Sequence, residues 1–270
     1  MFNDSNNIRI MSYSKYSAKV MRSFHNRVKG SLIQRAVYES SNCVLGSVKL
    51  FDVGVGRGGD MFKWDKCNIT HVIGYDPDPS SIEEAQRRYV QSNLPSKREY
   101  VFQCCNEIDD IEIPENTMDI VSCQFAIHYF FESQATLSRF LASVSRMLKP
   151  GGIFVGTFMD RYKVREYTFD GTAEFMNSAM LLHAPNHSVD AFSPLKVHLT
   201  GTLYFGENTV SNEYVVCRDV LESECEKHGL TLVEYKTFQQ YHDDYASDFK
   251  MNGDCTTCSY AYSSFMFRKN

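Results

Sequence analysis

The chain has 270 residues, of which 43% are hydrophobic, so it carries enough apolar material for one large core, and its formal net charge is −5. No stretch approaches the roughly 18 to 20 consecutive apolar residues of a membrane span, and the polar start at residues 1–7 lacks a secretory hydrophobic region. Nine scattered cysteines favour free thiols in a reducing compartment over a disulfide framework, which predicts a soluble, intracellular protein.

The N-terminal part is predicted to contain an amphipathic helix over residues 17–38, because Val20, Phe24, Val28 and Leu32 are spaced four apart. Residues 1–38 also hold seven basic side chains against one acidic side chain, Asp4. Contact with phosphate would account for this charge, and so would a solvated helix face.

Strands and helices are predicted to alternate between residues 48 and 158. The strands are too apolar to be half exposed, which predicts a parallel sheet covered on both faces, with its ligands at the carboxyl ends of the strands. The expected elements are strands 48–53, 71–76, 99–104, 118–123 and 153–158, and helices 61–66, 80–93 and 133–148.

Local signals set two of these boundaries. Ser80 and Glu83 have the S-x-x-E spacing of a capping box, which predicts a helix that starts at Ser80. Lys149-Pro-Gly-Gly152 is predicted to form a turn before strand 153–158.

The second half, residues 159–270, is interpreted as sheet edge plus a lid over the substrate. The chain shows no internal repeat and no low-complexity linker, so one domain over 1–270 is expected. The expected elements are a hairpin of strands 196–205 and 212–217 around a turn at 206–209, a helix at 218–228, and strands 230–238 and 260–267.

A glycine-rich loop, Asp52-Val-Gly-Val-Gly-Arg-Gly-Gly-Asp60, closes the first strand and opens a helix. Glycines there let the backbone turn sharply and approach a ligand. Gly54, Gly56 and Gly59 also fit G-x-G-x-x-G, so a nicotinamide-dinucleotide enzyme is one reading. Asp76 lies 22 residues after Gly54 and suits a ribose diol in either case.

Two features favour S-adenosylmethionine over a dinucleotide. Asp52, two residues ahead of the first glycine, would face a cationic aminoacyl-sulfonium ligand, whereas a pyrophosphate would be repelled. The turn 149–152 before the fifth strand is also common in methyltransferases of this architecture. Asn106 ends the third strand, where it would read the adenine edge, although a turn asparagine needs no ligand.

Cys255 and Cys258 form a single CxxC motif. A structural zinc site needs a second pair of ligands, and the sequence offers no evident one. An ordinary reduced pair is therefore the favoured interpretation, and no metal is expected.

The loop 52–60 with Lys63-Trp64, followed by Ser122-Cys-Gln-Phe-Ala-Ile-His-Tyr129, closely resembles the messenger RNA cap guanine-N7 methyltransferases. The resemblance extends from Phe24-His-Asn-Arg-Val-Lys29 to the terminal strand 262–269. Asp76-Pro-Asp78 and Thr157-Phe-Met-Asp160 look most like the versions in large cytoplasmic DNA viruses of the African swine fever virus kind.

The resemblance implies an α/β fold, the class I Rossmann-like S-adenosylmethionine-dependent methyltransferase fold, with a mostly parallel seven-stranded sheet and helices on both faces. Residues 1–40 would form a basic arm and helix, 41–158 the cofactor-binding core, and 159–270 the sheet completion and cap-binding lid. It also implies a capped RNA substrate, S-adenosylhomocysteine as product, and no membrane partner. Triphosphatase and guanylyltransferase domains on one longer capping polypeptide are expected, in the cytoplasm at a viral replication site or in the virion, or in the nucleus if the protein is cellular.

The resemblance also places the site residues. Those expected at the cofactor are Lys29, Asp52, Gly54, Gly56, Arg57, Asp76, Asn106 and Gln124. Those expected at the cap are Asn26, Phe125, His128, Tyr129, Glu213 and Tyr262. The chain departs from the family at three places: the family usually has Cys-Gly-Lys at Val55-Gly56-Arg57, Asn-Asn at His25-Asn26, and Asp at Asn106. The role of His25 is left open.

The reaction implied by the resemblance needs no acid or base. Guanine N7 carries a free lone pair, so His128, Tyr129 and Glu213 are expected to act by positioning and electrostatics. Without the resemblance, Phe125 and Tyr129 would be core aromatics and Glu213 a surface residue. A catalytically silent scaffold of a capping complex and a methyltransferase for another acceptor remain alternatives.

Overall fold

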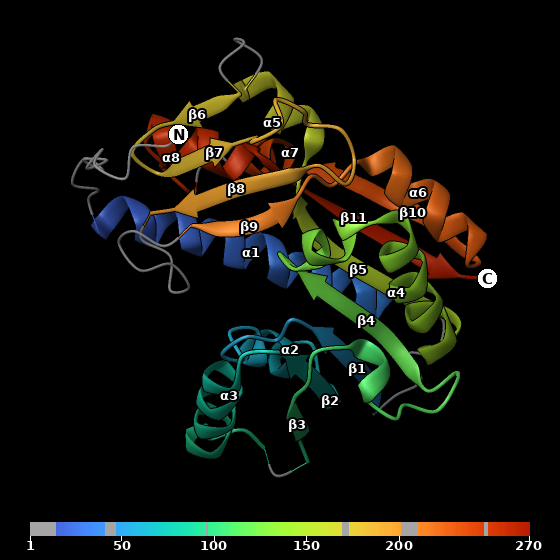
Figure 1. Ribbon diagram of the computed structural model, residues 1–270. Helices are drawn as coiled ribbons and strands as arrows, with labels where there is room; N and C mark the ends of the chain where they lie inside the picture. Colours follow the sequence, from blue (N-terminus) through green and yellow to red (C-terminus); the bar gives the residue numbers. More distant parts are fainter. Residues whose placement is uncertain (1–14, 41–46, 96, 169–172, 201–209, 246–247) are drawn as a thin grey trace.

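The structure is a computed structural model, and it describes the chain except for residues 1–14, 41–46, 96, 169–172, 201–209 and 246–247 (Figure 1). In the described part, no helix is long and apolar enough to cross a membrane. The turn expected at 206–209, and much of the strand before it, lie outside the described residues.

A seven-stranded sheet forms the centre of the molecule, in the order β10-β11-β5-β4-β1-β2-β3. Only β11 runs antiparallel to its two neighbours, β5 and β10, so the expected mostly parallel sheet is confirmed. Every residue of β4 is buried, as a strand covered on both faces requires. The strands are β1 (Val48–Val53), β2 (Ile69–Asp76), β3 (Glu99–Cys104), β4 (Met118–Gln124), β5 (Leu148–Met159), β10 (Leu230–Thr237) and β11 (Tyr262–Lys269).

Helices cover both faces of this sheet. On β1, Leu50 packs into the cluster that includes α1 (Lys15–Glu39), α2 (Met61–Lys66) and α3 (Pro79–Gln91). Its neighbour Phe51 packs into the opposite cluster, because successive side chains of a strand point to opposite faces. That second layer contains η1 (Ile108–Asp110), η2 (Ile127–Glu132), α4 (Gln134–Met147) and α6 (Arg218–Lys227).

A smaller antiparallel sheet lies beyond the carboxyl ends of β4 and β5 (Figure 1). It has the order β6-β7-β8-β9, and a third apolar cluster joins it to α1 through Phe24 and Val28. Its elements and neighbours are β6 (Glu174–Met176), β7 (Met180–His183), β8 (Pro194–Leu199), β9 (Ser211–Tyr214), α5 (Arg161–Thr168), α7 (Phe238–Asp244) and α8 (Gly253–Tyr260).

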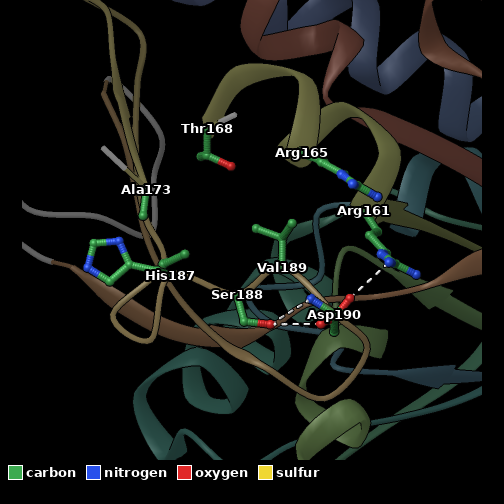
Figure 2. A pocket seen from close by; sticks show the side chains of 9 residues that line it. Arg161, Arg165, Thr168, Ala173, His187, Ser188, Val189 and Asp190 are labelled. Atoms are coloured by element: carbon green, nitrogen blue, oxygen red, sulfur yellow. Dashed lines mark hydrogen bonds and ion pairs between the residues drawn. The ribbon is translucent and has the colours of Figure 1, made fainter. Parts of the chain in front are cut away.

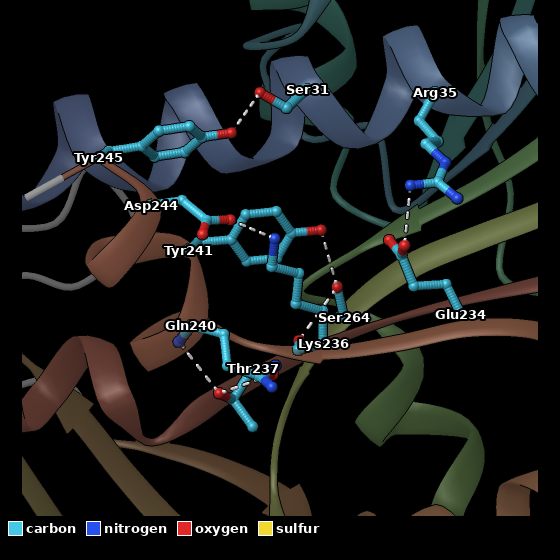
Figure 3. Close-up of polar contacts among 10 residues, drawn as sticks. All are labelled: Ser31, Arg35, Glu234, Lys236, Thr237, Gln240, Tyr241, Asp244, Tyr245 and Ser264. Atoms are coloured by element: carbon cyan, nitrogen blue, oxygen red, sulfur yellow. Dashed lines mark hydrogen bonds and ion pairs between the residues drawn. The ribbon is translucent and has the colours of Figure 1, made fainter.

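Polar contacts attach α7 and the chain after it to the large sheet and to α1 (Figure 3). Lys236 of β10 pairs with Asp244 at 2.5 Å, and the Tyr245 hydroxyl lies 2.8 Å from Ser31 Oγ. Arg35 of α1 reaches Glu234 of β10 at 2.9 Å. The N-terminal helix is thereby fixed to the C-terminal part of the chain.

The start of α3 differs from the sequence prediction. Asp78, not Ser80, is the N-cap: its carboxylate accepts hydrogen bonds from the backbone amides of Ser80 and Ser81. Pro79 is the first helical residue, where its fixed φ suits the helix and its missing N–H is no loss. The capping box expected at Ser80 and Glu83 is therefore wrong.

Other boundaries differ as well. On α1, Met21 is buried with Phe24, Val28 and Leu32, whereas Val20 is only half-buried. The turn 149–152 lies inside β5, as a bulge between the pairs Met118–Leu148 and Ile120–Ile153. The last strand begins at Tyr262 instead of residue 260, because α8 continues to Tyr260. The short elements α5, α7, α8, β6 and β7 were not predicted, since each is too short to show a clear period.

Candidate active site

The glycine loop connects β1 to α2 and lies against the ends of β2 and β4. Gly54, Gly56 and Gly58 have φ of 69°, 51° and 68°. A Cβ on Gly54 would stand 2.7 Å from the Ala126 Cβ, so only glycine fits. Gly59 lacks this constraint, with nothing within 4 Å of a Cβ placed on it. The third constrained glycine is therefore Gly58, which the G-x-G-x-x-G pattern did not single out.

Asp52 carries an unsatisfied buried oxygen beside this loop. Its side chain is 4% exposed, and its Oδ1 has no hydrogen-bond partner among the described residues. Burial, reinforced by the nearby Asp60 carboxylate, raises the pKa of Asp52 to about 8. A buried acceptor of this kind fits a cationic ligand group such as the ammonium of S-adenosylmethionine.

Asp60, at the other end of the loop, binds two lysines. The ammonium groups of Lys29 and Lys63 each lie 2.7 Å from Asp60 Oδ1. Burial would raise the pKa of Asp60, but the two ammonium groups hold it below its usual value. Lys29, which the resemblance placed at the cofactor, thus reaches the loop from α1. Asp60 and Lys63 were not predicted from the sequence as site residues, although both lie in or next to the glycine loop.

Asp76 ends β2, and its orientation is fixed by backbone amides. Its Oδ2 accepts from the Gly56 amide at 2.9 Å and its Oδ1 from the Asp78 amide at 3.0 Å. Each carboxylate oxygen keeps a second lone pair, which is the arrangement a ribose diol requires. Asn106, two residues beyond β3, is exposed, and Arg57 is half-buried within the loop.

Gln124 ends β4 and is held by protein groups at both ends of its amide. Its Nε2 donates to Ser122 Oγ at 3.4 Å, and its Oε1 accepts from Thr157 Oγ1 at 3.2 Å. These contacts join the carboxyl ends of β4 and β5. The cofactor role predicted for Gln124 stays a prediction.

Phe125 follows with a backbone φ of 56°, which is unfavourable for a phenylalanine. Its amide donates to the Thr157 carbonyl at 3.1 Å, and the edge-to-face ring of Tyr262 lies 5.1 Å away. The His25 imidazole stacks on Phe125, with centroids 5.6 Å apart and planes at 27°. Burial, followed by the charge of Lys29, lowers the pKa of His25 to about 3, so the imidazole is neutral. Asn26, next to His25, is exposed.

His128 of η2 faces Glu213 of β9, so the small sheet contributes to the site. His128 Nδ1 lies 3.7 Å from Glu213 Oε2, and each residue is 7% exposed. His128 Nε2 has no partner among the described residues, and burial lowers the His128 pKa although Glu213 opposes this. The Tyr129 ring lies 4.1 Å from the imidazole and is 53% exposed. The unused polar atoms suit a planar polar ligand.

A separate cavity of about 270 Å³ lies between α5 and residues 184–190 (Figure 2). Arg161 and Arg165 line it, and Arg161 donates to Asp190 Oδ1 at 2.9 Å. It contains none of the residues predicted for the site.

Cys255 and Cys258 are buried on α8, and neither is in a disulfide. Among the residues that the structure describes, no group of three or more His, Cys, Asp or Glu side chains is arranged to hold a metal ion.

A family model described as "mRNA (guanine-N(7))-methyltransferase domain" matches residues 2–253. Proteins named mRNA cap guanine-N(7) methyltransferase are similar to this chain. The one from Eremothecium gossypii is 30% identical over 242 residues, which is 82% of this chain and 54% of that protein. The one from Schizosaccharomyces pombe is 28% identical, over 81% of this chain and 61% of that protein. The one from Drosophila melanogaster is 34% identical, over 53% of this chain and 37% of that protein.

The chain thus spans about two fifths to three fifths of the length of these relatives. All three come from cellular eukaryotes, so they do not support the viral attribution made from the sequence.

Solved structures share the fold. An S-adenosylmethionine-dependent methyltransferase from Clostridium acetobutylicum matches with a TM-score of 0.58 at 14% identity, over 96% of this chain and 93% of that one. Geranyl diphosphate C-methyltransferase from Streptomyces coelicolor also matches with a TM-score of 0.58 at 14% identity, over 96% of this chain and 85% of that one. The fold is therefore the class I S-adenosylmethionine-dependent methyltransferase fold, as expected from the sequence.

Proposed function

The chain belongs to the mRNA (guanine-N7)-methyltransferase family, and from that premise we propose that it transfers a methyl group from S-adenosylmethionine to N7 of the guanine cap of mRNA. GpppN-RNA would become m7GpppN-RNA. One observation carries this proposal: the loop with the unsatisfied Asp52 carboxylate adjoins, at the end of β4, a buried pair of polar groups, His128 and Glu213. A cationic cofactor and a polar base would both find partners there.

The residues around the loop fit S-adenosylmethionine, which when bound supplies the methyl group. Asp52 would accept from its ammonium group and Asp76 from its ribose hydroxyls. Gly54 and Gly56 let the backbone approach the ligand. Lys29 and Arg57 would face its carboxylate, and Asn106 and Gln124 its adenine. The product leaving this subsite is S-adenosylhomocysteine, and no metal is needed.

The acceptor subsite fits a guanine. Phe125 and Tyr262 would pack on its ring, and His128 and Glu213 would hydrogen-bond its edges, with Tyr129 and Asn26 at the exposed side. The Glu213 carboxylate also favours the positive charge that N7 methylation creates on the base. Because N7 attacks with a free lone pair, no proton has to be removed. Orientation by these side chains would then supply roughly 7 to 11 kcal/mol of the barrier.

Transfer of labelled methyl to GpppRNA, with uncapped RNA and GpppA as comparisons, tests the proposal. We expect transfer to the capped substrates only. Glu213→Ala should lower kcat/KM for the cap about 100-fold, as loss of a group stabilising developing charge does. The affinity for S-adenosylmethionine should stay within about twofold, since Glu213 lies outside the loop. Unchanged transfer by Glu213→Ala would make the guanine contact wrong.

The same assay separates two alternatives. Cofactor binding without transfer to any RNA would favour a silent scaffold or stimulatory subunit of a capping complex. Transfer to uncapped RNA or to a small molecule would favour another acceptor. The position of Glu213 opposite His128, both buried, favours the cap.

For residues 1–270, we propose a single methyltransferase domain with an arm and helix at 1–40, a core at 41–158 and a lid at 159–270. Further triphosphatase and guanylyltransferase domains on the same polypeptide are part of the viral version of this proposal. That version, with a cytoplasmic location, rests on Asp76-Pro-Asp78 and Thr157-Phe-Met-Asp160 alone. The cellular relatives favour the nuclear version.

A further inference from the structure

His25 is the one residue of α1 whose ring stacks on Phe125 among the described contacts. The two rings are offset and nearly parallel, with centroids 5.6 Å apart and planes at 27°. Tyr262 meets the same Phe125 ring edge-on at 89°. His25 therefore covers one face of a ring that lies in the acceptor subsite.

The imidazole is itself held from α8. His25 Nε2 lies 2.9 Å from Ser259 Oγ, and Ser259 Oγ can also donate to Met251 Sδ at 3.5 Å. Either His25 Nε2 or Ser259 Oγ can donate in the hydrogen bond between them, depending on the tautomer of the neutral imidazole. Ser259 is fully buried, and this hydrogen bond fixes the plane of the His25 ring.

Phe125 needs such support, because its backbone is in the left-handed region at φ 56°. The Phe125 amide is fixed by the carbonyl and the hydroxyl of Thr157, each at 3.1 Å. These bonds hold the backbone but not the side-chain angles. The ring is placed by its neighbours, and His25 supplies the stacked one.

One helical turn after His25, Lys29 binds Asp60 of the glycine loop at 2.7 Å. Residues four apart lie on the same face of a helix. The same face of α1 thus contacts Phe125 through His25 and the cofactor loop through Lys29, whose ammonium also lies 5.8 Å from the centroid of the Phe125 ring.

We propose that His25 is a positioning residue of the acceptor subsite, which fixes the Phe125 ring by stacking and is itself fixed by Ser259. This inference rests on the proposed function, because it gives Phe125 the role of a base-stacking surface. Its consequence is selective: loss of His25 weakens binding of the cap but leaves binding of the cofactor unchanged.

Three variants separate the ring stacking from the hydrogen bond to Ser259. His25→Ala removes the stack and the hydrogen bond, His25→Gln keeps an amide that can reach Ser259 but loses the ring, and Ser259→Ala loses only the hydrogen bond. His242→Ala is the matched control. The rings of His25 and His242 both contact the Phe24 ring, with centroids 5.9 Å and 5.5 Å away, but His242 forms its hydrogen bonds with the Tyr260 hydroxyl and the Phe249 carbonyl. The control substitution removes an imidazole from the same cluster without touching Phe125.

The KM for GpppRNA should rise about tenfold in His25→Ala and less in His25→Gln and Ser259→Ala, given the usual strength of a ring pair. The KM for S-adenosylmethionine should stay within about twofold in all four variants, and His242→Ala should match the wild type in both. Thermal unfolding of each variant reports any general loss of stability.

A cap KM that stays within twofold in His25→Ala, or that rises equally in His242→Ala, would reduce His25 to core packing and overturn the inference. Should His25→Ala fail to fold, the cap KM of Ser259→Ala decides by the same criterion. Absence of transfer to GpppRNA by the wild-type protein would instead overturn the proposed function, and this inference with it.

Discussion

At the scale of single residues, the site is marked by buried polar atoms that the fold leaves unsatisfied. Asp52 Oδ1 and His128 Nε2 both lack partners within the described residues, although a buried unpaired polar group costs about 1 to 3 kcal/mol. Unpaired buried atoms also occur elsewhere in the described residues, at Ser40 Oγ and Trp64 Nε1 for example, but these two lie near the carboxyl ends of the neighbouring parallel strands β1 and β4, where such sheets bind ligands. The bonding groups of a ligand bound there would replace the missing partners.

Asp52 gives a prediction about pH. Its pKa is raised to about 8, so the folded chain keeps a proton that the unfolded chain loses near pH 4. Asp52 therefore lowers the stability of the cofactor-free chain increasingly as the pH rises between these values. Binding a cationic ammonium requires the carboxylate, so cofactor binding should release a proton. Affinity should tighten from pH 6 to 7.5, by at most about tenfold per pH unit.

Calorimetric titration in buffers of different ionisation enthalpy measures this proton release. Asp52→Asn should weaken binding and abolish both the proton release and its pH dependence. An unchanged pH dependence in Asp52→Asn would assign the titration to another group.

At the scale of elements, turn chemistry decides how the glycine loop is built. Gly54 has φ 69° and no room for a Cβ beside Ala126, whereas Gly59 has open space. Gly54→Ala should therefore reduce cofactor affinity by more than tenfold and destabilise the fold by about 1 to 3 kcal/mol. Gly59→Ala is the control and should have little effect on the cofactor affinity or on the stability of the fold. Isothermal titration and urea unfolding measure the two effects, and equal losses in both variants would contradict this account.

The N-terminus of α3 gives a second prediction at this scale. Asp78 accepts from two backbone amides, so Asp78→Ala should lower Tm by about 2 to 4 °C. Ser80→Ala should shift Tm less, because the Ser80 hydroxyl only donates to Asp78. Thermal unfolding followed by circular dichroism compares the two. A larger loss in Ser80→Ala would restore the capping box expected from the sequence.

At the scale of the whole molecule, the last strand of the chain lies between β5 and β10 and completes the core. Phe265 of β11 is 2% exposed and packs 4.8 Å from Phe154 of β5. Phe265→Ala should cost about 3 to 5 kcal/mol of unfolding free energy, through lost burial and a cavity. Thr231→Ala on the edge strand should stay within about 0.5 kcal/mol. Denaturant unfolding measures the free energy of unfolding of both variants. If Phe265→Ala lost no more of this free energy than Thr231→Ala, β11 would not be integral to the core.

The sequence by itself determined the features that depend on neighbours along the chain. Apolar strands alternating with amphipathic helices predicted the parallel part of the sheet, and the glycine loop predicted a ligand at the end of β1. Asp52 and Asp76 were predicted as cofactor residues because both lie directly at strand ends, where a parallel sheet gathers its ligands. The resemblance carried by residues 122–129 then supplied the family.

Only the tertiary structure decided which distant residues meet. His25 reaches Phe125 from α1, and Glu213 reaches His128 from a second sheet whose short strands show little period. Asp78 replaced Ser80 as a cap because a proline follows it, and Gly58 replaced Gly59 because of packing against α3. The Asp78 cap is a local effect of Pro79, but His25, Glu213 and Gly58 share one physical reason: local sequence sets backbone periodicity, whereas side-chain partners are selected by close packing of elements that the chain brings together only on folding.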